Sequence, residues 1–331
     1  MKTFWMTCAA AVALSACSAS DDGAVVDDDM DIATMDDADD MAMSSDETRR
    51  TTLETEMMDA DMDMDVDMGA NMDEAALRPS PVQNARYKEL AEDGFCVAAG
   101  PQTPRDISFR DGTNPDMFMM APPASEMNLC NIHTHTNAEN KGPGFSISAG
   151  DGDNGGYQCN GTTDLTEAEL ADYPDMDYGK VAPGDTIEVH WVHTTCDVQP
   201  GEGLGSCLSD SCVDPLLRVE TQVFLVVNDR DAVDFMDFTE VERDNGMFQP
   251  AAIPTGSGTP VQFRGSTTGT SYDAKGVCSP LRVTWSVRPQ CQKLDIASLD
   301  AWAESGNVFN EVESHGIRPL VTDPRLLSPI N

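Results

Sequence analysis

Three short runs of alternating apolar residues constrain the fold of this chain more than any other feature of its sequence. The runs are TIEVHWVHT (186–194), LRVETQVFLVVND (217–229) and LRVTWSVRP (281–289), and they are rich in Val, Thr, Ile and aromatic residues. Such runs favour β-strands, in which successive side chains point to opposite faces of a sheet. Clusters of Gly, Asp, Asn and Pro between them, such as SAGDGDNGGYQCNG (148–161) and IPTGSGTPVQ (253–262), predict loops.

Two stretches carry helical signals instead. LTEAELADY (165–173) follows a possible N-cap at Thr163 or Asp164, and LDIASLDAWAESG (294–306) places apolar residues near helical spacing, with Gly306 just past its end. The chain is therefore predicted to be mainly β (α+β), with one large β-sheet domain and a few short helices.

The first 17 residues, MKTFWMTCAAAVALSAC, have the layout of a secretory signal, and their apolar run is too short for a permanent membrane span. The box LSAC (14–17) resembles the cleavage site of bacterial lipoproteins, which implies a lipid on Cys17. Ser18, rather than Asp, follows this cysteine and favours the outer membrane. We therefore expect an exported protein that meets the membrane only through a lipid anchor at Cys17.

Residues 18–81 are dominated by Asp and Met. From Ser18 to Ser80 there are 21 acidic residues and 3 arginines, in a chain whose formal net charge is −38. Such a segment buries too little apolar surface to offset its chain entropy, which predicts a disordered linker. We interpret it mainly as a spacer, and alternatively as a cation-collecting tail. The folded domain is then expected at residues 82–331, and its acidity argues against nucleic acid as a partner.

Eight cysteines remain beyond the signal, an even number that predicts disulfides in an oxidising compartment. Local pairs between Cys207 and Cys212 and between Cys278 and Cys291 are plausible, but eight cysteines allow 105 pairings. Thiolate zinc ligands are the weaker interpretation, because the sequence has no CxxC pair.

Four of the five histidines lie in two segments, CNIHTHT (130–136) and TIEVHWVH (186–193). If both segments are strands, His133 and His135 share one face, and His190 shares a face with Glu188. His193 then lies on the opposite, mostly apolar face. Three converging imidazoles are typical of a catalytic zinc site, in which a carboxylate such as Glu188 fixes the tautomer of one ligand.

The segments CNIHTHTNAENKG (130–142) and GDTIEVHWVHTTC (184–196) resemble those of δ-class carbonic anhydrases, and the sequence from residue 281 to 329 is similar as well. The resemblance extends over roughly residues 96–331. In one departure, Asn140 stands where the family pattern leads us to expect histidine. The resemblance implies zinc-dependent reversible hydration of CO2 to bicarbonate.

The active site of α-class carbonic anhydrases offers a looser resemblance. It implies that the zinc ligands are His133, His135 and His190, and that Glu188 supports one of them. It also implies that Glu139 orients a hydroxyl relay, for which Thr322 is one candidate. Proton transfer to buffer is assigned to a histidine near the mouth of the site, His315 in preference to His193. Two alternatives remain: an exported copper- or zinc-binding protein without catalysis, and a zinc ester hydrolase.

Overall fold

The computed structural model describes residues 100–331, apart from residues 153, 175 and 269–278. The signal segment, Cys17, the acidic linker, Cys96 and Cys278 lie outside the described residues. In chain order, the elements are η1 (Ala124–Glu126), β1 (Asn128–Thr136), β2 (Phe145–Gly150), β3 (Gly156–Cys159), η2 (Asn160–Asp164), β4 (Thr186–Thr194), η3 (Leu204–Cys207), β5 (Leu217–Val227), η4 (Phe235–Phe238), β6 (Val241–Asp244), β7 (Met247–Pro250), β8 (Val261–Thr267), β9 (Leu281–Val287), β10 (Gln292–Asp295) and α3 (Ile296–Glu304).

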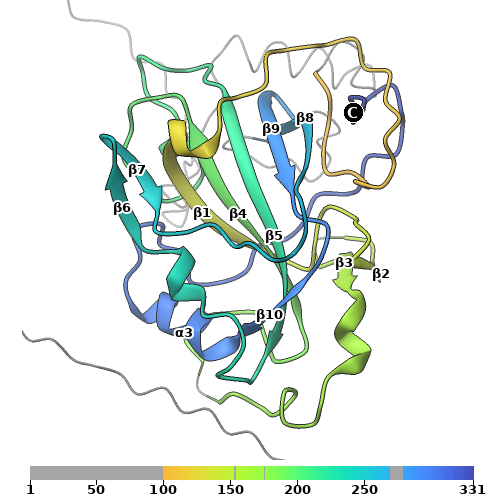
Figure 1. Ribbon diagram of the computed structural model, residues 1–331, viewed down its shortest axis with the longest axis vertical. Helices are drawn as coiled ribbons and strands as arrows, with labels where there is room; N and C mark the ends of the chain where they lie inside the picture. The colour runs from red at the N-terminus through yellow and green to blue at the C-terminus, as the bar shows by residue number, and fades with distance from the viewer. Residues whose placement is uncertain (1–99, 153, 175, 269–278) are drawn as a thin grey trace, which may run out of the picture. The chain divides into compact units, whose positions relative to one another are not determined.

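A six-stranded sheet forms the centre of the described domain (Figure 1). Its strands follow the order β1-β4-β5-β9-β8, and β10 pairs in parallel with the second half of β5. The strand pairs β1–β4, β4–β5 and β8–β9 are antiparallel, whereas β5 and β9 are parallel. The three alternating runs of the sequence are β4, β5 and β9, so the prediction of a mainly β fold is confirmed.

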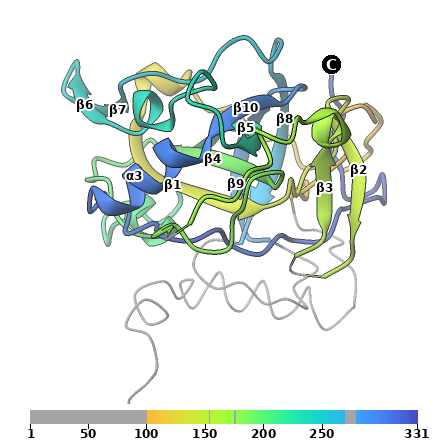
Figure 2. The same cartoon turned by 90° about the horizontal axis from the view of Figure 1, so that it is seen from below.

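The two faces of this sheet bury separate hydrophobic cores. Ile187, Val189 and Trp191 of β4 lie in the core that also holds Leu299 and Trp302 of α3. The other face packs a second cluster, which contains Val192, Val219, Phe263, Val283 and Trp285. Viewed from below, α3 and the hairpin of β2 and β3 lie on opposite sides of the described domain (Figure 2), and α3 packs against η4 and β10. Alternation along each strand therefore separates a helix-covered face from the opposite face.

The second predicted helix is confirmed, with narrower bounds. Leu294 and Asp295 end β10, and α3 begins at Ile296, where the Asp295 carboxylate caps it by accepting a hydrogen bond from the backbone N–H of Ala297 at 3.1 Å. Gly306 follows the helix with a positive φ of 65°, the conformation typical of a helix C-terminus. No helix in the described part of the chain is long and apolar enough to span a bilayer.

The first predicted helix, at residues 165–173, is wrong. These residues form turns, and a 3-10 helix precedes them at Asn160–Asp164. The Glu169 carboxylate accepts hydrogen bonds from the backbone N–H and hydroxyl of Thr166 and pairs with Lys293. Such local side-chain bonds compete with helix formation, and a segment this short has little cooperativity to resist them.

The predicted loop at residues 148–161 is only partly a loop. β2 continues to Gly150 and β3 begins at Gly156, so the segment is the turn and second strand of a hairpin. Both glycines have positive φ values, 102° and 91°. The glycine content therefore marks the tight ends of paired strands, because only glycine adopts this conformation without steric cost.

The described chain contains three disulfides, Cys130–Cys207, Cys159–Cys291 and Cys196–Cys212, which join residues 77, 132 and 16 positions apart. The local pair Cys207–Cys212 is therefore wrong, as is Cys278–Cys291, because Cys291 pairs with Cys159. Spacing in the sequence misleads here because the fold brings β1 beside η3, and β3 beside the segment before β10.

Peptide mapping of the unreduced protein is expected to recover these three linkages. Reduction should lower the free energy of unfolding, since a native bridge typically contributes about 2–4 kcal/mol. Chemical unfolding with and without a reductant measures this difference. A peptide linking Cys207 to Cys212 would contradict the pairing.

Candidate metal centre

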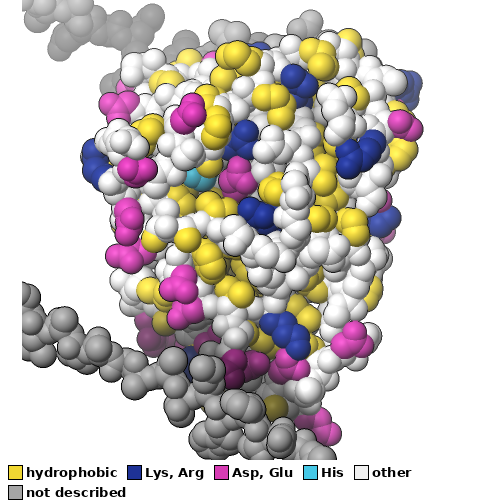
Figure 3. Space-filling model, viewed as in Figure 1, with side chains coloured by type: hydrophobic (Ala, Val, Ile, Leu, Met, Phe, Trp, Pro, Cys, Tyr) yellow, Lys and Arg dark blue, Asp and Glu magenta, His cyan; other side chains and the backbone are white. Residues whose placement is uncertain are grey.

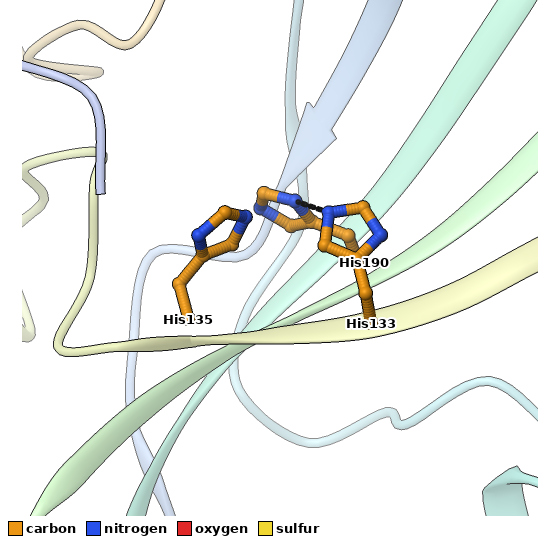
Figure 4. Close-up of side chains that lie close together, drawn as sticks. All are labelled: His133, His135 and His190. Carbon is orange, nitrogen blue, oxygen red and sulfur yellow. Dashed lines mark hydrogen bonds between the residues drawn. The ribbon is translucent and has the colours of Figure 1, made fainter. Parts of the chain in front are cut away.

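The pairing of β1 with β4 brings three histidines together. His133 lies directly opposite His190, and His135 lies opposite Glu188. Their rings converge from the two strands (Figure 4), with centroids 4.8–5.1 Å apart. One ring nitrogen from each histidine lies within 4.8 Å of the other two. The alternation of side chains along the two strands therefore predicts the same group of three histidines that the structure brings together.

A bulge in β1 changes the position of one neighbour. Regular alternation of side chains along β1 predicts that Cys130 shares a face with Ile132. Cys130 instead lies in the core with Val192, on the other side of the sheet. The register between β1 and β4 shifts between Leu129 and Asn131, and an extra residue at such a bulge re-aims the side chains beside it. Cys130 can therefore form its disulfide on the same side of the sheet as the histidines.

Hydrogen bonds orient two of the three rings. Nδ1 of His133 lies 2.6 Å from Oδ1 of Asn131, and Nδ1 of His135 lies 2.8 Å from the backbone oxygen of Gly316. Since both partners only accept, this network assigns the ring protons to Nδ1. Nε2 of both rings is then left with its lone pair, which is the form that a metal ion requires.

The donor set fits a transition-metal ion such as zinc. Tetrahedral zinc with Zn–N distances of about 2.0–2.1 Å separates pairs of ligand nitrogens by about 3.3 Å. Nε2 of His133 and Nδ1 of His190 lie 3.2 Å apart. When the ring proton of His190 lies on Nε2, both of these nitrogens have a lone pair to give to a cation placed between them. Three imidazoles also leave a fourth position for a small ligand.

Burial favours the neutral form of His133 and His135. Removal from water lowers the pKa of His135 to about 4, against the opposing effect of the Glu139 carboxylate. The pKa of His133 also lies well below its usual value, first because of burial and then because of the neighbouring imidazoles. Protons therefore do not compete strongly with a metal ion for these nitrogens near neutral pH.

Two buried carboxylates lie behind the histidines. Glu188 is fully buried, and its Oε1 lies 3.7 Å from Nε2 of His190, which has no hydrogen-bond partner among the described residues. Glu139 is also buried, and both of its oxygens are bound by the guanidinium of Arg318, at 2.8 and 3.2 Å. Burial is the largest single influence and would raise the pKa of Glu139. The charge and hydrogen bonds of Arg318, together with the neighbouring His135 and His190, outweigh it and hold this pKa well below the usual range.

His315 and His193 occupy different environments. The side chain of His315 is 50% exposed, its ring lies 6.5 Å from that of His133, and its Nε2 is 2.9 Å from Oε2 of Glu311. This hydrogen bond is the main cause of its raised pKa. His193 is completely buried and donates from Nδ1 to the backbone oxygen of Trp191 at 3.1 Å, and burial lowers its pKa to about 4.

A cavity of about 1130 Å³ opens over the three histidines. His315, Glu139 and Arg318 contribute to its lining, as do the apolar side chains of Val192, Leu204, Val219, Trp285 and Phe309. Thr322 is exposed and outside this lining, whereas Thr136 is part of it, with a buried hydroxyl that has no partner among the described residues. On the face shown in Figure 3, only a small area of histidine reaches the surface among interspersed charges.

A family model described as delta carbonic anhydrase matches residues 124–298, which include both histidine segments. The chain belongs to the delta carbonic anhydrase family. Membership supports a carbonic anhydrase-like activity at the level of the family and confirms the resemblance of the two segments. A comparison with curated proteins gave no match.

Several residues of the site were missed by the sequence interpretation. Glu311, Gly316 and Arg318 contact or neighbour the histidines, yet they follow the matched residues by more than ten positions. Asn131 is different, because it precedes His133 by two residues and so shares its face of β1. Strand parity could have identified Asn131, but no local signal marks the C-terminal residues.

Proposed function

We propose that this protein catalyses the reversible hydration of CO2 to bicarbonate at a zinc ion held by His133, His135 and His190. The observation that carries this proposal is the convergence of three imidazoles that line a cavity with an apolar wall. When bound, zinc lowers the pKa of a water molecule to about 7, which supplies a nucleophile near neutral pH.

The apolar wall suits an uncharged substrate. Val192 of β4 lies opposite Val219 of β5, which in turn lies opposite Trp285 of β9, and the Trp285 ring contacts His190 at 5.1 Å between centroids. All three side chains are almost fully buried and line the cavity. CO2 carries no charge and no net dipole, so this largely apolar row can hold it beside the histidines at a low desolvation cost.

Other residues have proposed roles in orientation and proton transfer. Glu188 orients His190, and Glu139, held by Arg318, presents a fixed negative charge towards the cavity. Hydration joins the oxygen of water to the carbon of CO2 and releases one proton. We assign the exit of that proton to His315, because its ring is half-exposed at the cavity and 6.5 Å from that of His133.

Metal analysis coupled to a stopped-flow CO2 assay tests the proposal. One zinc per chain with CO2 hydration would support it. Copper at one equivalent without hydration would favour an exported metal-binding protein. Zinc with ester hydrolysis and no CO2 hydration would favour an ester hydrolase.

Filling the apolar wall should reduce activity without removing the metal. Val219→Phe places a larger ring where we expect CO2, and a displacement of about 1 Å from the reacting position can cost about 100-fold in rate. Stopped-flow measurement should show kcat/KM reduced by at least about 10-fold, with zinc content unchanged. Val219→Ala, which enlarges the cavity, is the control and should lose less. Equal activity in Val219→Phe and wild type would contradict the assigned CO2 position.

We also propose that the protein is exported and anchored to the outer membrane by a lipid on Cys17. The LSAC box supports this proposal, and so do the three disulfides, which persist in oxidising compartments.

Cys17→Ser is expected to prevent lipid attachment and to release the protein from membrane fractions. Mass spectrometry of the N-terminal peptide measures the acyl group directly. A wild-type protein that is fully soluble in the periplasm and carries no acyl mass would exclude the anchor.

A further inference from the structure

Glu188 is surrounded by donors that hold each of its oxygens separately. Oε2 accepts hydrogen bonds from the backbone N–H of Glu139 at 2.6 Å and of Asn140 at 3.4 Å. Oε1 accepts from Nδ2 of Asn140 at 3.0 Å and lies 3.7 Å from Nε2 of His190. Asn140 thus contributes the side-chain donor on the oxygen that faces the histidine.

The amide of Asn140 is itself fixed. It is completely buried, and its Oδ1 accepts a hydrogen bond from the backbone N–H of Arg105 at 3.1 Å. Because the oxygen of the amide must face this donor, Nδ2 must face Glu188, and the reverse orientation would place two acceptors together. Asn140 therefore bridges the segment at Arg105 and the carboxylate behind His190.

His190 completes this chain of contacts. Its Nε2 is buried without a hydrogen-bond partner among the described residues, and Oε1 of Glu188 is 3.7 Å away, slightly beyond hydrogen-bond length. A small shift would allow Nε2–H to donate to that oxygen. The ring proton would then stay on Nε2, and Nδ1, which faces His133, would keep its lone pair for a metal ion.

We propose that Asn140 is a positioning residue for the metal centre: its amide holds Oε1 of Glu188 opposite Nε2 of His190 and so keeps Nδ1 of His190 available to the metal. This inference rests on the proposed function, since it assumes that His190 is a ligand. It also gives a physical role to the position at which the chain departs from the expected family pattern. An amide suits the position because it offers a donor to Glu188 and an acceptor to Arg105 at once.

Zinc competition against a chelator of known affinity tests the proposal with the full chain. Asn140→Leu should bind Zn2+ about 10- to 100-fold more weakly than wild type, the usual effect of removing a partner behind a metal ligand. The absorption spectrum of the Co2+-substituted protein should change as well, because it reports the geometry of the ligands. Asn140→Asp, which keeps the side-chain shape, should also weaken zinc binding. This variant replaces Asn140→Leu in the test if Asn140→Leu does not fold.

A matched control separates positioning from general stability. Asn128 is also a buried amide with two backbone partners, since it donates to the oxygen of Cys196 and accepts from the N–H of Phe248, both at 3.0 Å. It has no contact with Glu188 among the described interactions. Asn128→Leu should therefore lower the melting temperature of the metal-free protein but leave zinc affinity and the Co2+ spectrum as in wild type.

A double variant tests whether Asn140 acts through Glu188. Glu188→Gln should weaken zinc binding by itself. Adding Asn140→Leu to it should weaken zinc binding by less than about 3-fold more, because Asn140 acts on His190 only through Glu188. Independent effects that multiply would overturn the proposal, and so would wild-type zinc affinity in Asn140→Leu. If wild type binds zinc and hydrates CO2 in the same experiments, such a result rejects the role of Asn140 alone. A wild type that binds no zinc would reject the proposed function as well.

Discussion

Replacing His133 with alanine is expected to empty the metal centre and abolish CO2 hydration together. Three imidazoles supply every protein ligand of the proposed site, so each of His135→Ala and His190→Ala should have the same effect. The nearby carboxylates of Glu139 and Glu188 are held by Arg318 and by Asn140, so we do not expect them to replace a lost imidazole. Zinc content per chain and stopped-flow hydration, measured on the same samples, should fall to background.

His193→Ala is the matched control for these variants. His193 is three residues from His190 and equally buried, but it lies on the face of β4 that carries Ile187, Val189 and Trp191. Its removal should reduce stability, because it leaves space in a packed region, and it should retain zinc. If His193→Ala contains no zinc while His190→Ala retains it, the assignment of ligands from the alternation of side chains along β4 is wrong.

The strands could be predicted because their sequences alternate. TIEVHWVHT coincides with β4, from Thr186 to Thr194, because each face of that strand packs into its own core. The alternation also groups the histidines correctly, since an antiparallel pair in register keeps side chains on the same face beside each other. Fold class and the histidine cluster are therefore both consequences of a period of two residues.

The remainder of the site could not be predicted from local patterns. Arg318 meets Glu139 across 179 residues of sequence, and Gly316 contacts His135 across 181. The C-terminal segment reaches them by running beside the edge strand β1, where the backbone of His315 bonds to Thr134 and Thr136. Nothing in the spacing of these residues indicates such a path, and the disulfide pairs were misjudged for the same reason.

The second large effect is expected for Arg318→Leu. This change removes the partner of Glu139, whose side chain is 1% exposed, and leaves a carboxylate buried without a compensating charge. Breaking a buried ion pair on one side typically costs about 3–5 kcal/mol. Urea unfolding of the metal-free protein should show a loss of about this size. Zinc affinity should fall as well, because Glu139 and its backbone N–H lie beside His135 and Glu188.

Two further variants make this prediction specific to the buried pair. Arg325→Leu removes another arginine from the same C-terminal segment, but Arg325 is 70% exposed in its pair with Asp323, so the loss should stay below about 1 kcal/mol. Adding Glu139→Gln to Arg318→Leu removes the buried charge itself and should recover part of the lost stability. The contrary outcome is that the double variant loses as much unfolding free energy as the two single variants added together. Arg318 would then stabilise the domain mainly by packing against Trp285, whose ring centroid lies 5.8 Å from its guanidinium, and not by neutralising Glu139.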